Sequence, residues 1–98
     1  MEMNNKMLDE EENKIFRTKM KRSGYHDVDI KRIEKELSVS YWNQDNFVTA
    51  VITHDKLGVV SIGVVKRNPI DPFNEGIGIK YSFVRAIDNY EYIYNHEF

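Results

Sequence analysis

The sequence predicts an α+β domain with two N-terminal helices, a small antiparallel β-sheet of two or three strands, and a C-terminal helix packed on the sheet. Apolar residues recur at helical spacing within residues 7–37 and again within residues 79–94, whereas β-branched residues dominate residues 59–65. A second alternating run occupies residues 47–53. Helices that are segregated from a run of strands are typical of the α+β class.

Length and composition limit the possibilities further. The 98 residues suffice for one domain, and the absence of cysteine excludes disulfides, thiolate catalysis and cysteine-ligated zinc. The net charge of −2 disfavours a generic nucleic-acid binder. The polar, acidic N-terminus is unlike a signal peptide, and no apolar run reaches transmembrane length. We therefore expect a soluble protein in the cytoplasm of a bacterial host cell.

The first third of the chain predicts a helical pair in residues 7–37, preceded by a flexible segment in residues 1–6. The first helix runs from Met7 or Leu8 to Arg22, with acids at its start and bases at its end, as the helix dipole favours. Gly24 follows its end. The second helix spans residues 28–37 and takes Asp27 as its N-cap.

Residues 38–66 are predicted to form the sheet. Residues 38–42 form a short strand or an extended lead-in, and a polar turn follows. Residues 47–53 carry apolar side chains on both faces, so this strand is expected to be central. Residues 54–58 close a hairpin to the strand at 59–65.

The prolines Pro69 and Pro72 end the last strand, because proline has no amide hydrogen to donate. Asp71 or Asn74 could cap the helix predicted for residues 72–94. One face of that helix is apolar and comprises Ile79, Phe83, Ala86, Tyr90 and Tyr94.

A short motif in this region resembles a pattern in small accessory proteins of phages and prophages of Gram-positive bacteria. The matching residues are Lys66, Pro69, Asp71, Phe73, Asn74, Gly78, Arg85 and Ala86. In those proteins a β-hairpin leads through an Asp-x-aromatic-Asp/Asn turn and a glycine into a helix. The resemblance covers residues 47–88 and departs at Tyr81, Phe83 and Val84, where alanine is more usual. The resemblance implies an origin in a mobile element. Inhibition of the anti-CRISPR type is among the functions that it implies.

No pattern in the sequence indicates catalysis. The histidines His26, His54 and His96 lack partners at ligand spacing, and no G-x-S-x-G motif is present. Asp55 and Asp71 could approach each other as paired carboxylates, but both are at ordinary turn positions. We therefore predict no enzyme activity and no catalytic, cofactor-binding or metal-binding residues.

The sequence favours a protein that binds another protein. Aromatic and acidic residues are concentrated near the C-terminus, and a second acidic block lies near the N-terminus. The expected partner is a host protein, such as a CRISPR effector nuclease, with a homodimer through the same surface as an alternative. The predicted contact residues are Asp88, Tyr90, Glu91, Tyr92, Tyr94, Asp9, Glu10, Glu11 and Glu12. The acidic block could instead serve only to stabilise the first helix.

A small nucleic-acid-binding regulator is the alternative function. It would use the basic residues Lys19, Lys21, Arg22, Lys31, Arg32, Lys35, Lys66 and Arg67. The turn at residues 24–26 has the length that a helix-turn-helix requires. Acidic residues interleaved with the bases of the second helix weigh against this alternative, because they would repel phosphates.

Overall fold

The computed structural model describes the backbone of residues 5–66 and 75–97, and the side chains of residues 5–66 and 77–90. In this part of the chain the elements are β1 (Lys6–Met7), α1 (Glu10–Arg22), α2 (Asp27–Glu36), β2 (Leu37–Gln44), β3 (Phe47–His54), β4 (Gly58–Lys66) and α3 (Glu75–Glu97). None of its helices has the length and apolar character that a membrane span requires.

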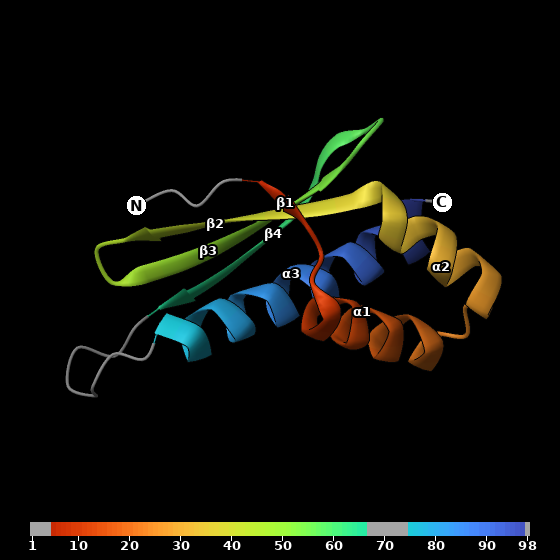
Figure 1. The fold of residues 1–98 in the computed structure, drawn as a ribbon, viewed down its shortest axis with the longest axis horizontal. Coiled ribbons are helices and arrows are strands. Elements are labelled where there is room, and N and C mark those ends of the chain that lie inside the picture. The colour runs from red at the N-terminus through yellow and green to blue at the C-terminus, as the bar shows by residue number, and fades with distance from the viewer. Residues whose placement is uncertain (1–4, 67–74, 98) are drawn as a thin grey trace.

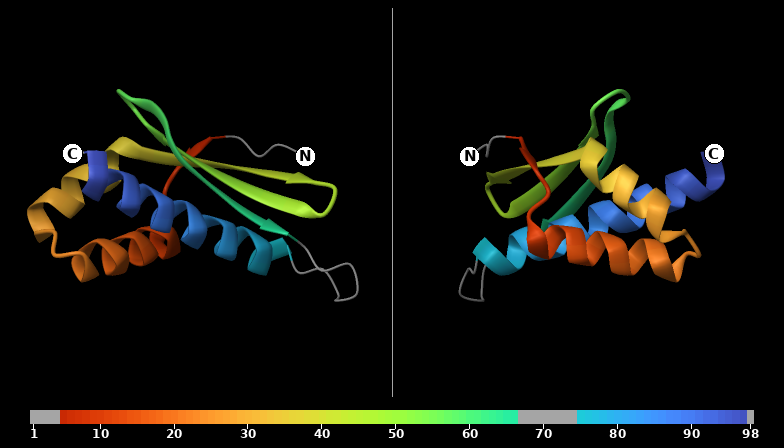
Figure 2. Two further views of the ribbon diagram at one scale, coloured as in Figure 1. Left: turned by 180° about the vertical axis from the view of Figure 1, so that it is seen from behind. Right: turned by 45° about the vertical axis from the view of Figure 1, so that its right-hand side comes forward.

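The strands form one antiparallel sheet in the order β1-β2-β3-β4, and the helices lie on one side of it (Figures 1 and 2). The predicted α+β class and the helix packed on the sheet are confirmed, and β3 is interior as expected. The sheet has four strands rather than two or three, because Lys6 and Met7 pair with Val39 and Ser38. Lys6 falls in the segment predicted to be flexible, and Met7 falls at the start of the predicted helical pair. A strand of two residues is too short to produce an alternating pattern in the sequence.

The core lies between the sheet and the helices. Alternate residues of β2 and β3 point to the helices, as the period of two in a strand requires. α3 lies directly over β3 and β4, and α1 packs beside α3. The core side chains are Leu8, Phe16, Met20, Ile30, Ile33, Leu37, Val39, Tyr41, Ala50, Ile52, Phe83, Ala86, Ile87 and Tyr90.

The helix boundaries differ from the predictions in ways that local hydrogen bonds explain. α1 starts at Glu10 rather than Met7 or Leu8, because Asp9 and Glu12 form a reciprocal capping box at the turn. Asp27 is not the N-cap of α2 but its first residue, and His26 takes the cap position with extended backbone angles. There Asp27 is close to the positive end of the helix dipole. The proposed caps Asp71 and Asn74 lie outside the described residues.

α3 crosses β4 at very short range. A Cβ added to Gly63 would lie under 3.0 Å from the backbone O of Ser82 and the backbone N of Ala86. Beside this crossing, Ser61 Oγ donates a hydrogen bond to the backbone O of Ala86 at 2.5 Å. Small residues on both elements therefore let the backbone of the helix rest on the backbone of the strand.

Gly63→Ala should destabilise the fold, because the added methyl group meets helix backbone, which cannot rotate away. We expect the free energy of unfolding to fall by about 3 kcal/mol, measured by urea denaturation followed by circular dichroism. Val64→Ala, on the exposed side of the same strand, is the control and should cost less than about 1 kcal/mol. Equal losses in the two variants would contradict a close crossing at Gly63.

Candidate protein-binding surface

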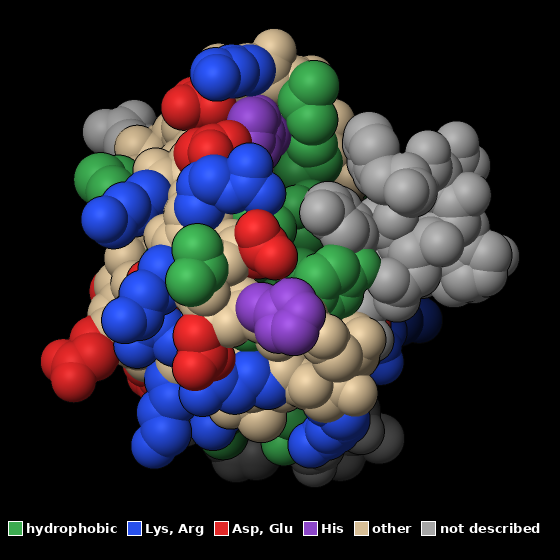
Figure 3. Space-filling view, turned by 90° about the vertical axis from the view of Figure 1, so that its right-hand side faces the viewer, with side chains coloured by type: hydrophobic (Ala, Val, Ile, Leu, Met, Phe, Trp, Pro, Cys, Tyr) green, Lys and Arg blue, Asp and Glu red, His purple; other side chains and the backbone are tan. Residues whose placement is uncertain are grey.

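The basic residues of α1 and α2 lie at one end of the molecule, where acidic side chains alternate with them (Figure 3). Several bases are paired: Lys19 with Asp88 at 2.7 Å, Lys21 with Asp27 at 3.4 Å and Arg32 with Asp29 at 3.6 Å. Lys66 is at the opposite end of the sheet, paired with Phe47, whereas α2 leads into the end where Leu37 pairs with His54. Arg67 lies outside the described residues. The structure therefore does not assemble the predicted bases into one continuous phosphate-binding surface.

The two N-terminal helices are held together by a bidentate ion pair. Arg17 Nε donates to Glu34 Oε2 and Arg17 Nη2 to Glu34 Oε1, both at 2.7 Å. The hydrogen bonds and the charge of Glu34 raise the pKa of Arg17 further above its usual value. Glu34 is nearly buried, so Arg17 supplies the partner that a buried carboxylate needs.

Glu36, His54 and Asp55 form the one group of potential metal ligands found among the described residues, with ligand atoms within 4.8 Å of one another. Both ring nitrogens of His54 are already engaged. Nδ1 lies 3.1 Å from the backbone N of Lys56 and 3.3 Å from Asp55 Oδ1, and Nε2 lies 2.5 Å from Glu36 Oε2. These contacts connect the β3–β4 hairpin to the end of α2. A metal ion bound here would have to displace them.

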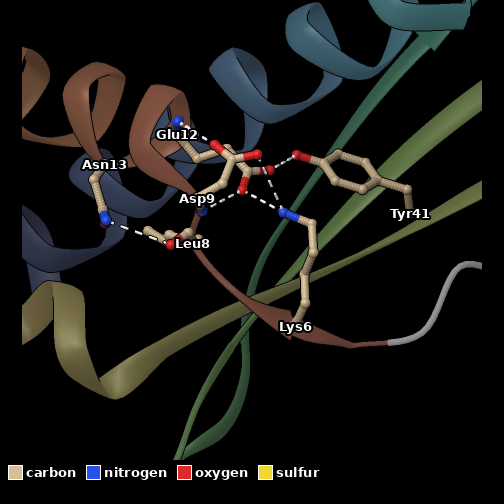
Figure 4. Close-up of polar contacts among 6 residues, drawn as sticks. All are labelled: Lys6, Leu8, Asp9, Glu12, Asn13 and Tyr41. Carbon is tan, nitrogen blue, oxygen red and sulfur yellow. Dashed lines mark hydrogen bonds and ion pairs between the residues drawn. The ribbon is translucent and has the colours of Figure 1, made fainter.

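A buried polar cluster ties the start of α1 to the sheet (Figure 4). Glu12, only 6% exposed, accepts hydrogen bonds from Lys6 Nζ at 2.6 Å, from the backbone N of Asp9 at 2.8 Å and from the Tyr41 hydroxyl. Asp9 in turn accepts from the backbone N of Glu12 at 2.8 Å. Three donors from β1, the helix cap and β2 thus converge on one carboxylate.

The pKa shifts in this cluster favour the protonation states in which its hydrogen bonds form. Burial, then the hydrogen bond and charge of Glu12, raise the pKa of Tyr41, so its phenol stays protonated and donates. Partial burial opposes the charge of Lys6, but the hydrogen bond and charge of Glu12 outweigh it and raise the pKa of Lys6. The backbone hydrogen bond from Glu12 lowers the pKa of Asp9. These groups form a structural clamp rather than an acid–base site.

The predicted contact residues are therefore not one surface. Glu12 is buried in the clamp, so the expectation that it presents its charge to a partner is corrected. Asp9 caps α1 but its side chain is 60% exposed, so its contact with a partner stays a prediction. Tyr90 is also corrected: it is 7% exposed and its ring lies 6.2 Å from that of Phe16. Glu10, Glu11 and Asp88 are exposed. The side chains of Glu91, Tyr92 and Tyr94 lie outside the described residues.

An open groove of about 400 Å³ runs between α1 and α3 and is called here the α1–α3 groove. Its lining is formed by Glu11, Lys14, Ile15, Thr18, Lys19, Lys80 and Val84. Lys80 approaches Glu11 across it at 3.9 Å, with both side chains more than half exposed. The groove therefore combines an apolar component with charged residues that water can reach.

Apolar residues of α3 lie within one helical turn of the groove residues Lys80 and Val84. Ile77, Tyr81 and Val84 follow one another at helical spacing, so they form one stripe on the outer side of α3. Ile77 is 51% exposed and Tyr81 is 56% exposed. The departure from the phage-protein pattern marked Tyr81 and Val84 as bulkier than expected, but it could not tell that Tyr81 faces solvent. No family model, curated protein or solved structure matches the chain.

Tyr41→Phe should weaken the fold by about 1.5–3 kcal/mol, because the buried carboxylate of Glu12 loses one of its donors. The measurement is the free energy of unfolding in urea. Tyr81→Phe removes the same atom from an exposed ring and should change stability by less than about 0.5 kcal/mol. A Tyr41→Phe variant as stable as Tyr81→Phe would show that the clamp contributes nothing.

The free energy of unfolding should depend on pH at acidic values because of Asp9. Because the pKa of Asp9 is lower in the folded state, its contribution is complete above the unfolded value of about 3.9. It is lost as the pH falls through the lower folded value. Asp9→Asn keeps a good N-cap but does not titrate. The stability advantage of wild type over this variant should therefore shrink below about pH 4, as measured by urea denaturation across pH; a constant difference would contradict it.

Proposed function

We propose that this protein acts without catalysis, by binding another protein in the α1–α3 groove. The observation that carries the proposal is the exposure of Ile77 and Tyr81 beside the groove. Large apolar side chains that remain half exposed next to a hollow are typical of a docking site, in which aromatic residues contribute much of the affinity. Covering the exposed halves of Ile77 and Tyr81 is worth roughly 1 kcal/mol each.

The charges around the groove define the partner. Three lysines, Lys14, Lys19 and Lys80, line the groove with a single glutamate, Glu11. Lys19 is paired with Asp88 and Lys80 lies near Glu11, so Lys14 is the lysine best able to meet a partner. The groove between two helices suits a third helix. The occupant we propose is an amphipathic helix whose apolar stripe is flanked by acidic residues.

The resemblance to phage accessory proteins supplies the class of partner that we propose, a host defence nuclease of the CRISPR effector type. The lysines of the groove bear on how such inhibition would work. Nucleic-acid channels of nucleases are basic, and a groove lined by lysines would be repelled by them. We therefore propose that inhibition occurs through an acidic helical surface outside the channel.

The proposal is tested by capture from a host extract with matched charge reversals. Lys14→Glu places a negative charge in the groove, whereas Lys31→Glu makes the same change on the exposed side of α2. Each lysine follows an acid four residues earlier, Glu10 and Asp27 respectively, so the cost to the helix is comparable. We expect Lys14→Glu to lower recovery of a stoichiometric partner at least about tenfold and Lys31→Glu to leave it unchanged.

A photo-crosslinking amino acid at position 81 identifies the contacted segment. The expected crosslink is to a helix of the partner with an apolar stripe and flanking acids. Crosslinking to a basic segment, or equal recovery with Lys14→Glu and Lys31→Glu, would refute binding in the groove.

A further inference from the structure

The side of the sheet turned away from the helices, called here the outer sheet face, is left uncovered by the described part of the chain (Figures 1 and 2). The pairing registers place on it Met7, Ser38, Ser40, Trp42, Gln44, Phe47, Thr49, Val51, Thr53, Val59, Ile62, Val64 and Lys66. Trp42, Phe47, Ile62 and Val64 are each between 41% and 47% exposed. A shallow hollow at one end of this face is lined by Trp42, Gln44, Phe47, Thr49 and Val64, together with Asp45 of the β2–β3 turn, which brings a negative charge to that end.

The composition of this face is unlike that of the rest of the surface. Charged residues make up 31% of the chain. By contrast, among the residues that the pairing registers place on the outer sheet face, the charged one is Lys66, at the very end of β4. Hydroxyl, β-branched and aromatic side chains fill the remaining positions. A partner that relied on charged residues for recognition would find no charge to pair with in the middle of this face.

The β4 edge of the sheet, in contrast, is already protected. Arg85 Nη1 donates to the backbone O of Val64 at 2.9 Å, and Asn89 Nδ2 donates to the backbone O of Ile62 at 2.8 Å. A strand added to β4 would have to displace both side chains. Occupied edge carbonyls are one way in which proteins prevent edge-to-edge pairing. Addition of a strand at the β4 edge is therefore disfavoured.

We propose that a second copy of this chain packs on the outer sheet face, so that two sheets stack face to face in a homodimer. An uncharged face meets its own copy without repulsion between like charges, and β-branched and aromatic side chains interdigitate when sheets pack about 10 Å apart. This homodimer is independent of the α1–α3 groove, which lies on the helical side. The two copies each leave that groove open.

The size of the face sets the strength of the dimer. Eight residues rising about 3.3 Å each, across three strands about 4.8 Å apart, cover about 400 Å². Two copies then bury about 800 Å² in total, below the range of stable complexes. The dimer is therefore weak and depends on concentration.

Trp42 is the single tryptophan of the chain and reports directly on the face. Sedimentation equilibrium and tryptophan emission are measured on the full chain from about 1 µM to about 1 mM. The mass should rise from 11.6 kDa toward twice that value, and the emission should shift to the blue over the same range as Trp42 is covered. A constant mass of one chain would overturn the proposal.

Ile62→Lys and Thr49→Glu place charges of opposite sign on neighbouring strands of the face, and each should keep the protein monomeric with unshifted emission. Their thermal unfolding, followed by circular dichroism, checks that they fold. Tyr81→Lys is the control on the helical side and should leave dimerisation unchanged. The proposal would be overturned if Tyr81→Lys abolished the dimer while Ile62→Lys did not. It would also be overturned if the wild type stayed monomeric and captured another protein only when Ile62 is intact. The variants at Lys14 test the groove separately.

Discussion

The direct contact between the backbones of α3 and β4 is the constraint on which the rest of the molecule depends. Gly63 permits it by lacking a side chain, and Ser61 fastens it with a hydrogen bond to Ala86. With α3 held so close, Phe83 and Ile87 reach the sheet and become fully buried. α1 then packs beside α3 and the groove between them forms. The same contact places the helices on one side, so the other side of the sheet remains bare.

Most ionic interactions among the described residues join separate elements of the fold. Glu12 receives donors from β1 and β2, Glu34 joins α2 to α1 through Arg17, and Glu36 meets His54 of the hairpin. In each case a carboxylate that is buried or partly buried is satisfied by a neighbouring element. Some charges that look available in the sequence are therefore already committed in the fold. Recognition is left to exposed apolar residues and to charges that stay exposed, such as Lys14.

The two apolar surfaces suit different kinds of association. The groove is narrow and bordered by exposed lysines, which favour a partner of defined charge and orientation. The outer sheet face carries few charges, which suits the second copy of the chain proposed above. Specificity thus resides on the helical side, while the sheet side contributes area. A dimer formed through the sheet would present two grooves and could bind a partner with higher avidity.

The sequence by itself determined the class of fold, the interior position of β3 and the C-terminal helix, because periods of two and of 3.6 residues survive in any local context. It could not determine β1, which is too short to show a period, or the roles of Glu12 and Tyr90, which look solvent-exposed until a sheet and a helix cover them. Nor did it mark Gly63 or the outer sheet face. Whether an apolar side chain is buried depends on what packs against it, and residues distant in the chain decide that. Only the tertiary structure therefore separated core from surface.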